Sequence, residues 1–353
     1  MTDRHSHPVP ALVWLAWALA AAASVQLAPN PLYVTLVIAI SALVVEGHAA
    51  DGPLRGAFPV VLLAGLAFAS LRLVLTVATT HGTGGVLVRL PEATLPTILG
   101  GFTVGGAVEG PVVARAAAEG WAIVGMLAVF AAFNAVVSHY ELVVAAPRAF
   151  YEVGLSVTVA LAFVPSTVAA VGAVREADRA RTGGRVVRRG RLVRQIVPIL
   201  EAGMERAVSL AESMDSRGFG HQRSTGADAV AGWLSLAGLV GLGACFVALV
   251  GRATRPALVL ALLGLGAIAG AVVVASRADG RASYRRRRLS GRDWVLAAVA
   301  WLAPLVLAIL TAADDATLVW PGDRLAVPGL NLVAIASLGA LALPAARAGQ
   351  STP

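Results

Sequence analysis

Two short segments combine arginine with small residues in a pattern suited to binding a partner protein. Residues 177–181 read Ala-Asp-Arg-Ala-Arg, and residues 213–219 read Ser-Met-Asp-Ser-Arg-Gly-Phe. Arginine presents five donors in a rigid fork and stays charged at any relevant pH, so it can bind carboxylates or carbonyl groups. Each segment ends a helical pattern. We therefore expect two stiff helices that present cations at their ends.

The composition is that of a membrane protein with several spans. The chain has 353 residues, of which 58% are hydrophobic and only 14% charged, and its mean hydropathy is +0.77. No lysine occurs, which excludes a phosphate-binding loop of the Gly-x-x-x-x-Gly-Lys type and a Schiff base within this chain. Any ATPase activity must then come from another polypeptide. The one cysteine, Cys245, excludes an internal disulfide.

Hydropathy predicts an all-α, polytopic protein with about eight spanning helices. Three domains follow: an N-terminal membrane domain over 1–137, a cytoplasmic domain with a pair of long helices over 138–228, and a C-terminal membrane extension over 229–353. The glycines and prolines of residues 79–110 predict an external loop instead of a helix. The expected spans cover residues 11–28, 32–45, 57–78, 117–137, 230–250, 257–276, 294–311 and 325–343.

The distribution of charge orients these spans. Residues 175–194 hold eight arginines, the loop at 277–292 is again strongly basic, and an acidic loop follows the seventh span. The positive-inside rule places the basic segments and the N-terminus in the cytoplasm. Residues 153–174 are apolar enough to cross the membrane, and a crossing there would reverse this parity. We expect them instead to lie along the membrane and to bury their apolar surface on a membrane partner.

The central domain is predicted to hold two long helices. The first covers residues 150–181, with a kink at Pro165, and ends at the glycines of residues 182–184. The second begins near residues 195–199 and runs to Arg217, with Gly218 as its C-terminal cap. It is amphipathic, because apolar residues recur at helical spacing on one side: Leu200, Met204, Ala207, Val208, Ala211 and Met214.

This arrangement resembles the transmembrane (T) component of energy-coupling factor (ECF) transporters over about residues 57–220. The resemblance is carried by Phe163-Val164-Pro165, by residues 176–181, by Pro198 with Arg206-Ala207, and by residues 213–219. In that family two coupling helices cross beneath a substrate-binding S component, and their arginine ends dock into two ATPase subunits. The chain departs from the family at Thr182, where glycine is usual, and at Ser216, where alanine is common.

The resemblance implies site residues by position. The first docking motif is Ala180-Arg181 and the second is Ser216-Arg217-Gly218, with Arg179, Pro165, Met214 and Asp215 in supporting positions. It also implies a non-catalytic subunit of a vitamin or transition-metal importer in the bacterial inner (plasma) membrane. Its expected partners are two ABC-type ATPases, an S component and the lipid bilayer, with no nucleic acid. No cofactor and no metal site is expected.

Two other classes of function remain to be weighed. An integral membrane lipid-handling enzyme would need acids or histidines clustered at the interface, and the sequence shows no such cluster. A stand-alone secondary transporter would need inverted repeats with broken helices, whereas the basic block occurs once. Arg72, inside the third span, is expected to snorkel or to pair with another helix. Glu119 is expected at the end of a span.

Overall fold

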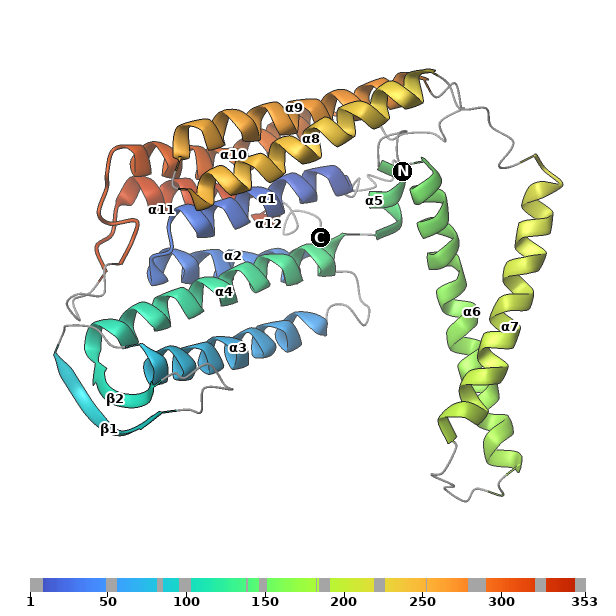
Figure 1. Ribbon diagram of the computed structural model, residues 1–353, viewed down its shortest axis with the longest axis horizontal. Coiled ribbons are helices and arrows are strands. Elements are labelled where there is room, and N and C mark those ends of the chain that lie inside the picture. The colour runs from blue at the N-terminus through green and yellow to red at the C-terminus, as the bar shows by residue number, and fades with distance from the viewer. Residues whose placement is uncertain are drawn as a thin grey trace, which may run out of the picture. The chain divides into compact units, whose positions relative to one another are not determined.

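The protein is an all-α, polytopic membrane protein with a single small β-hairpin among the described residues (Figure 1). The computed structural model describes residues 9–48, 56–80, 85–94, 103–137, 139–145, 151–181, 183, 191–218, 226–251, 253–278, 290–320 and 328–346. Within these, seven helices are long and apolar enough to cross a membrane: α2, α3, α4, α6, α8, α9 and α10. The chain divides into two compact units, Met1–Leu142 with Arg287–Pro353, and Val143–Arg286.

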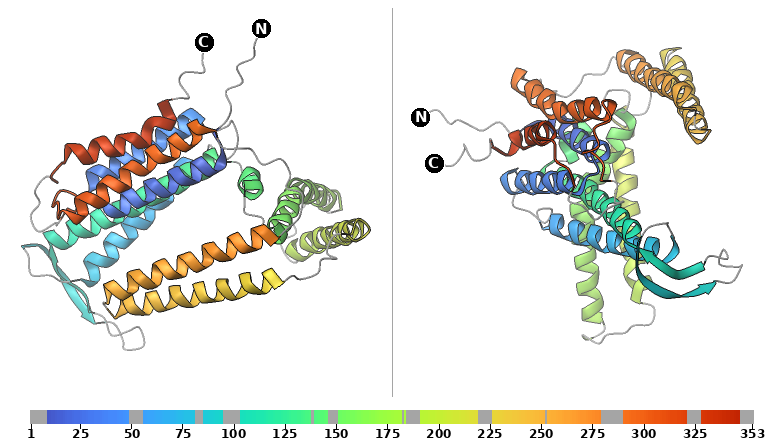
Figure 2. Two further views of the ribbon diagram at one scale, coloured as in Figure 1. Left: turned by 90° about the horizontal axis from the view of Figure 1, so that it is seen from above. Right: turned by 90° about the vertical axis from the view of Figure 1, so that its left-hand side faces the viewer.

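The first unit has its core between helices from both ends of the chain (Figure 2). The helices α1 (Ala11–Leu27), α2 (Pro31–His48), α4 (Gly110–Val136) and α10 (Gly291–Ala312) pack together. The C-terminal segment α11 (Leu332–Gly339), η3 (Ala340–Ala342) and α12 (Leu343–Ala346) packs against α2 and α10. The buried indole of Trp17 donates from Nε1 to the carbonyl of Leu341 at 2.9 Å, which joins the first helix to the last residues described.

A polar network fastens the loop after α10 to the turn between α1 and α2. Asn30, which is only 1% exposed, donates from Nδ2 to the carbonyls of Thr317 at 2.8 Å and Gly329 at 3.1 Å. Its Oδ1 accepts from the Leu32 amide at 3.0 Å. The Asn331 amide donates to the Tyr33 hydroxyl at 2.7 Å. Buried polar groups are nearly always paired in this way. Asn30 therefore holds the loop after α10 at two points, Thr317 and Gly329.

The helix α3 (Ala57–Thr79) packs against α4, and most of its remaining surface is exposed. The two helices are connected through an antiparallel pair, β1 (Val86–Thr94) and β2 (Thr103–Glu109). The predicted loop over residues 79–110 is therefore wrong in part. The register is irregular between Leu90 and Ala93, on either side of Pro91, because proline cannot donate to the ladder. Opposite it, Gly105 has φ +98°, and a Cβ there would lie 2.0 Å from the Pro91 carbonyl oxygen.

The second unit contains two helical pairs. The helices α6 (Tyr151–Arg181) and α7 (Arg191–Asp215) cross each other, while α8 (Gly226–Val250) and α9 (Thr254–Ala278) form a close antiparallel hairpin (Figures 1 and 2). The α8–α9 approach depends on small residues, since a Cβ at Gly238 would lie 2.5 Å from Ile268 Cγ1. Along the chain, the division between the two units falls within the short helix α5 (His139–Ala145), after Leu142.

The structure confirms the predicted class and the crossing pair, and it changes several element boundaries. The helix α4 begins at Gly110, seven residues before the expected start at 117, because Pro111 is favourable in a first helical turn. The expected eighth span over 325–343 is not one long helix in its described part: residues 328–331 are not helical, and α11 is followed by a 3₁₀ turn before α12 begins at Leu343. The segment Gly154–Arg181 meets the length and apolarity criteria for a span, as the alternative topology requires.

Candidate functional site: the arginine ends of two crossing helices

The first arginine motif forms the last turn of α6. Arg179, Ala180 and Arg181 are all helical and exposed, and α6 continues through Pro165 without interruption. The helix ends where the Gly183 amide donates to the Ala180 carbonyl at 3.4 Å, and Gly183 has φ +56°. Cations in the last turn are stabilised by the negative end of the helix dipole. The helix end therefore favours the charge at position 181.

The second arginine motif forms the turn that ends α7. The helix stops at Asp215, two residues before the predicted end, and tightens into a turn. The Arg217 amide donates to the Met214 carbonyl at 3.1 Å, and the Gly218 amide donates to Asp215 at 2.8 Å. Gly218 has φ +78°, which confirms it as the C-terminal cap. Ser216 donates from its hydroxyl to the Ser213 carbonyl at 3.0 Å, so its side chain stabilises the turn.

Both guanidinium groups are available to a partner. Arg181 and Arg217 are exposed, and no hydrogen bond or ion pair joins either side chain to another described residue. Of the supporting residues, Asp215 is exposed and Met214 is half-buried. The two motifs share one local design: an exposed arginine in a turn that closes a long helix.

The two motifs lie at opposite ends of the helical pair. Gln195, in the second turn of α7, donates from Nε2 to Asp178 Oδ2 in the last turn of α6 at 3.2 Å. The end of α6 therefore meets the beginning of α7, and the two helices run antiparallel (Figure 1). Arg217 follows the far end of α7, whose 25 residues extend about 37 Å at 1.5 Å per residue. Arg181 and Arg217 are therefore too far apart to contact the same point on a partner protein.

The apolar side of α7 lacks a covering element in the part of the chain that the structure describes. The predicted stripe on α7 includes Leu200, Met204 and Val208, whose exposed fractions are 59%, 69% and 56%. A different set of residues, spaced three or four apart, is half-buried along α7: Gln195, Ile199, Ala202, Arg206, Leu210 and Met214. The amphipathic pattern is thus confirmed, but most of its apolar side does not pack on α6.

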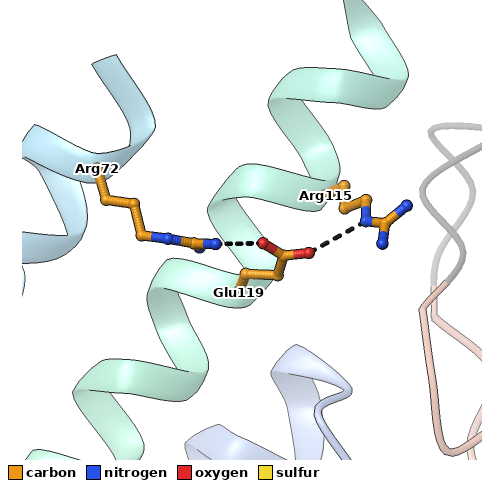
Figure 3. Close-up of polar contacts among 3 residues, drawn as sticks. All are labelled: Arg72, Arg115 and Glu119. Carbon is orange, nitrogen blue, oxygen red and sulfur yellow. Dashed lines mark hydrogen bonds and ion pairs between the residues drawn. The ribbon is translucent and has the colours of Figure 1, made fainter. Parts of the chain in front are cut away.

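A second charged cluster joins α3 to α4 and was only partly expected. Arg72 Nη2 and Arg115 Nε donate to the two carboxylate oxygens of Glu119, the latter over 3.0 Å (Figure 3). The expectation that Arg72 pairs with another helix is confirmed. Glu119, expected at the end of a span, lies nine residues after the first residue of α4, because this helix begins before the predicted span. The sequence could not identify Glu119 as the partner of Arg72, because the two residues lie 47 positions apart on different helices.

Other kinds of site receive no support from the described ranges. Over those ranges, no group of three His, Cys, Asp or Glu side chains is close enough to hold a metal ion. Comparisons with known proteins add no family: no protein-family model matches the sequence, and a search of curated proteins finds no match.

Proposed function

We propose that this chain is the transmembrane coupling subunit of an ECF-type ABC importer. In this role it transmits the movement of two partner ATPases to a separate substrate-binding membrane subunit, for uptake of a vitamin or a transition-metal ion. The chain itself is non-catalytic, and ATP hydrolysis takes place in the partners. The observation that carries the proposal is the placement of two exposed, helix-terminating arginines at opposite ends of one crossing pair.

The separation of the arginines supports two ATPase contacts instead of one. Arg181 and Arg217 are held apart by the length of α7, so each is expected to reach a different subunit. An arginine fork forms charge-assisted, bidentate hydrogen bonds with carboxylates, each stronger than a neutral hydrogen bond. When the two ATPases approach or separate, the stiff helices transmit that displacement to whatever rests on them.

The uncovered side of α7 supports a membrane partner above the pair. The stripe of Leu200, Met204 and Val208 is continuous and apolar, and such a helix face docks into an apolar groove of another protein. In our proposal this partner is the small substrate-binding subunit. Tilting of α7 would then move that subunit directly.

The charges on α7 favour a pair that lies at the cytoplasmic surface. Glu201, Glu205 and Arg206 occupy the middle of α7, which crosses α6. If α6 spanned the bilayer with α7 beside it, these charges would enter the hydrocarbon core, where each is expensive. We therefore assign α6 to the membrane surface, although its length and apolarity would permit a crossing.

The docking test uses the tagged full chain, purified with its partners from native membranes. We expect wild-type protein to bring down ATP-binding chains, identified by mass spectrometry and by ATPase activity. The double variant Arg181→Glu/Arg217→Glu should lose these chains and abolish uptake while keeping its thermal stability. The matched control is Arg277→Glu, which changes another exposed arginine at a helix C-terminus. Full ATPase recovery by the double variant would refute the assignment of the docking residues.

A labelling test decides the topology. In a Cys245→Ser background, Glu212→Cys places a single thiol on an exposed position of α7. We expect no reaction with a membrane-impermeant maleimide in sealed cells and full reaction after permeabilisation. Labelling in sealed cells would place α7 outside, beyond the reach of any cytosolic ATPase.

A further inference from the structure

The cluster of Arg72, Arg115 and Glu119 carries more positive than negative charge. Two guanidinium groups share a single carboxylate, and both oxygens of that carboxylate are occupied. Arg72 lies 16 positions into the 23-residue apolar helix α3, about 10 Å before its end at 1.5 Å per residue. A net positive charge at that depth is unfavourable unless an anion accompanies it.

One nitrogen of Arg72 is left without a partner. Its Nη2 donates to Glu119, whereas Nη1 is buried and has no hydrogen-bond acceptor among the described residues. An unsatisfied buried donor on a charged group is costly. The unpaired donor and the excess charge both mark Arg72 as the residue whose charge a nearby anion would stabilise.

Arg72 also lines a surface groove of about 250 Å³ on α3, and the composition of that groove changes along the helix. Toward the middle of the helix the groove is apolar, and toward the β-hairpin end it carries hydroxyl groups. Its apolar residues are Phe68, Leu71 and Leu75, and its polar ones are Thr76, Thr79 and Thr80. Because these residues recur every three or four positions, they form one continuous face.

We propose that this groove binds an anionic phospholipid, with its phosphate beside the Arg72 guanidinium and one acyl chain along Phe68 and Leu71. Phe68 and Leu71 precede Arg72 along the groove and the three threonines follow it, which matches the order of chain, phosphate and headgroup in a lipid lying parallel to α3. Phosphate is a strong acceptor for guanidinium. The bound lipid neutralises the cluster and covers α3, whose outer surface no described helix covers.

The test titrates the full chain in detergent and counts bound molecules by native mass spectrometry. The three probes are phosphatidylglycerol, phosphatidylcholine and inorganic phosphate. We expect one phosphatidylglycerol to bind about tenfold more tightly than phosphatidylcholine. Both lipids carry a phosphate, but the choline cation of phosphatidylcholine repels the positively charged cluster, and a tenfold loss is within the range of one like-charge repulsion near a protein surface. Arg72→Met, in which Glu119 keeps Arg115 as a partner, should abolish this preference. Arg292→Met, an exposed arginine at the start of α10, should leave it intact.

A second variant separates a lipid from a free anion. Phe68→Ala removes apolar surface four positions before Arg72 and keeps the cluster, so it should weaken phosphatidylglycerol binding at least fivefold and leave any phosphate binding unchanged. Equal lipid preference in wild type and Arg72→Met overturns the proposal. Binding of inorganic phosphate alone, unaffected by Phe68→Ala, overturns the lipid as its source. Failure of this test leaves ATPase docking at Arg181 and Arg217 unaffected, because the lipid site lies on α3.

Discussion

Replacement of Asn30 by alanine should measurably weaken the first unit. The change removes two hydrogen bonds to the carbonyls of Thr317 and Gly329 and one from the Leu32 amide. At about 1 kcal/mol for each bond, the expected loss is about 3 kcal/mol. Because Asn30 is 1% exposed, water cannot easily replace the missing partners. For a unit of this size the melting temperature should fall by roughly 6–12 °C.

The assay is thermal unfolding of purified protein in one detergent, followed by intrinsic tryptophan fluorescence. Ser70→Ala is the control, because the Ser70 hydroxyl donates only to the Leu66 carbonyl of its own helix and is exposed. A shift within about 0.5 kcal/mol is expected for it.

A third variant tests the physical cause. Asn30→Asp keeps the acceptor for Leu32 but directs a carboxylate at two carbonyl oxygens, so at neutral pH it should be less stable than Asn30→Ala. Acidification should narrow the difference, because a protonated carboxyl can donate to one carbonyl. The network does not hold this loop if Asn30→Ala has the same melting temperature as wild type. The same conclusion follows if Asn30→Asp is more stable than Asn30→Ala at neutral pH.

Two further predictions concern the α8–α9 hairpin and the loop after α10. Gly238→Ala should destabilise the hairpin by about 1–3 kcal/mol, since its Cβ would lie 2.5 Å from Ile268 Cγ1. Gly243→Ala, whose Cβ meets nothing within 4 Å, should instead stabilise the helix by up to about 1 kcal/mol, because alanine favours a helix interior over glycine. Resistance to proteolysis measures both effects. Hydrogen bonds from the Thr317 amide and hydroxyl, and from the Asn331 side-chain amide, lower the pKa of Asp315 below its usual value. Its stabilising effect is therefore complete above that value and is lost as pH falls through the folded-state pKa. Asp315→Asn should flatten the melting temperature between pH 5 and 3, and an unchanged pH profile would contradict this cause.

Hydropathy alone was sufficient for most of the helices, because a spanning segment must satisfy its backbone hydrogen bonds internally and be apolar throughout. It leaves open whether α6 crosses the membrane, since hydropathy registers the apolarity of a segment and not whether lipid or protein covers it. The hairpin β1–β2 was missed because its glycines and proline were counted as helix breakers. Those residues in fact allow the irregular register opposite Pro91.

The two arginine motifs were placed correctly at helix ends because capping is local in sequence. Gly218 adopts the left-handed conformation that its position after α7 suggested. The antiparallel course of α6 and α7 depends on packing across a connector, which periodicity does not encode. The Arg72–Glu119 pair likewise required knowledge of which helices are neighbours.

The hydrogen bond between Trp17 and Leu341 has a consequence for biosynthesis. Its two ends are 324 residues apart, and a ribosome adds roughly 5–20 residues per second. The opening helix must therefore wait roughly 15–65 s in the bilayer before its indole can meet the carbonyl that satisfies it. During this interval the N–H group of the Trp17 indole is exposed to lipid or to the insertion machinery. Loss of the segment that contains Leu341 would make that exposure permanent.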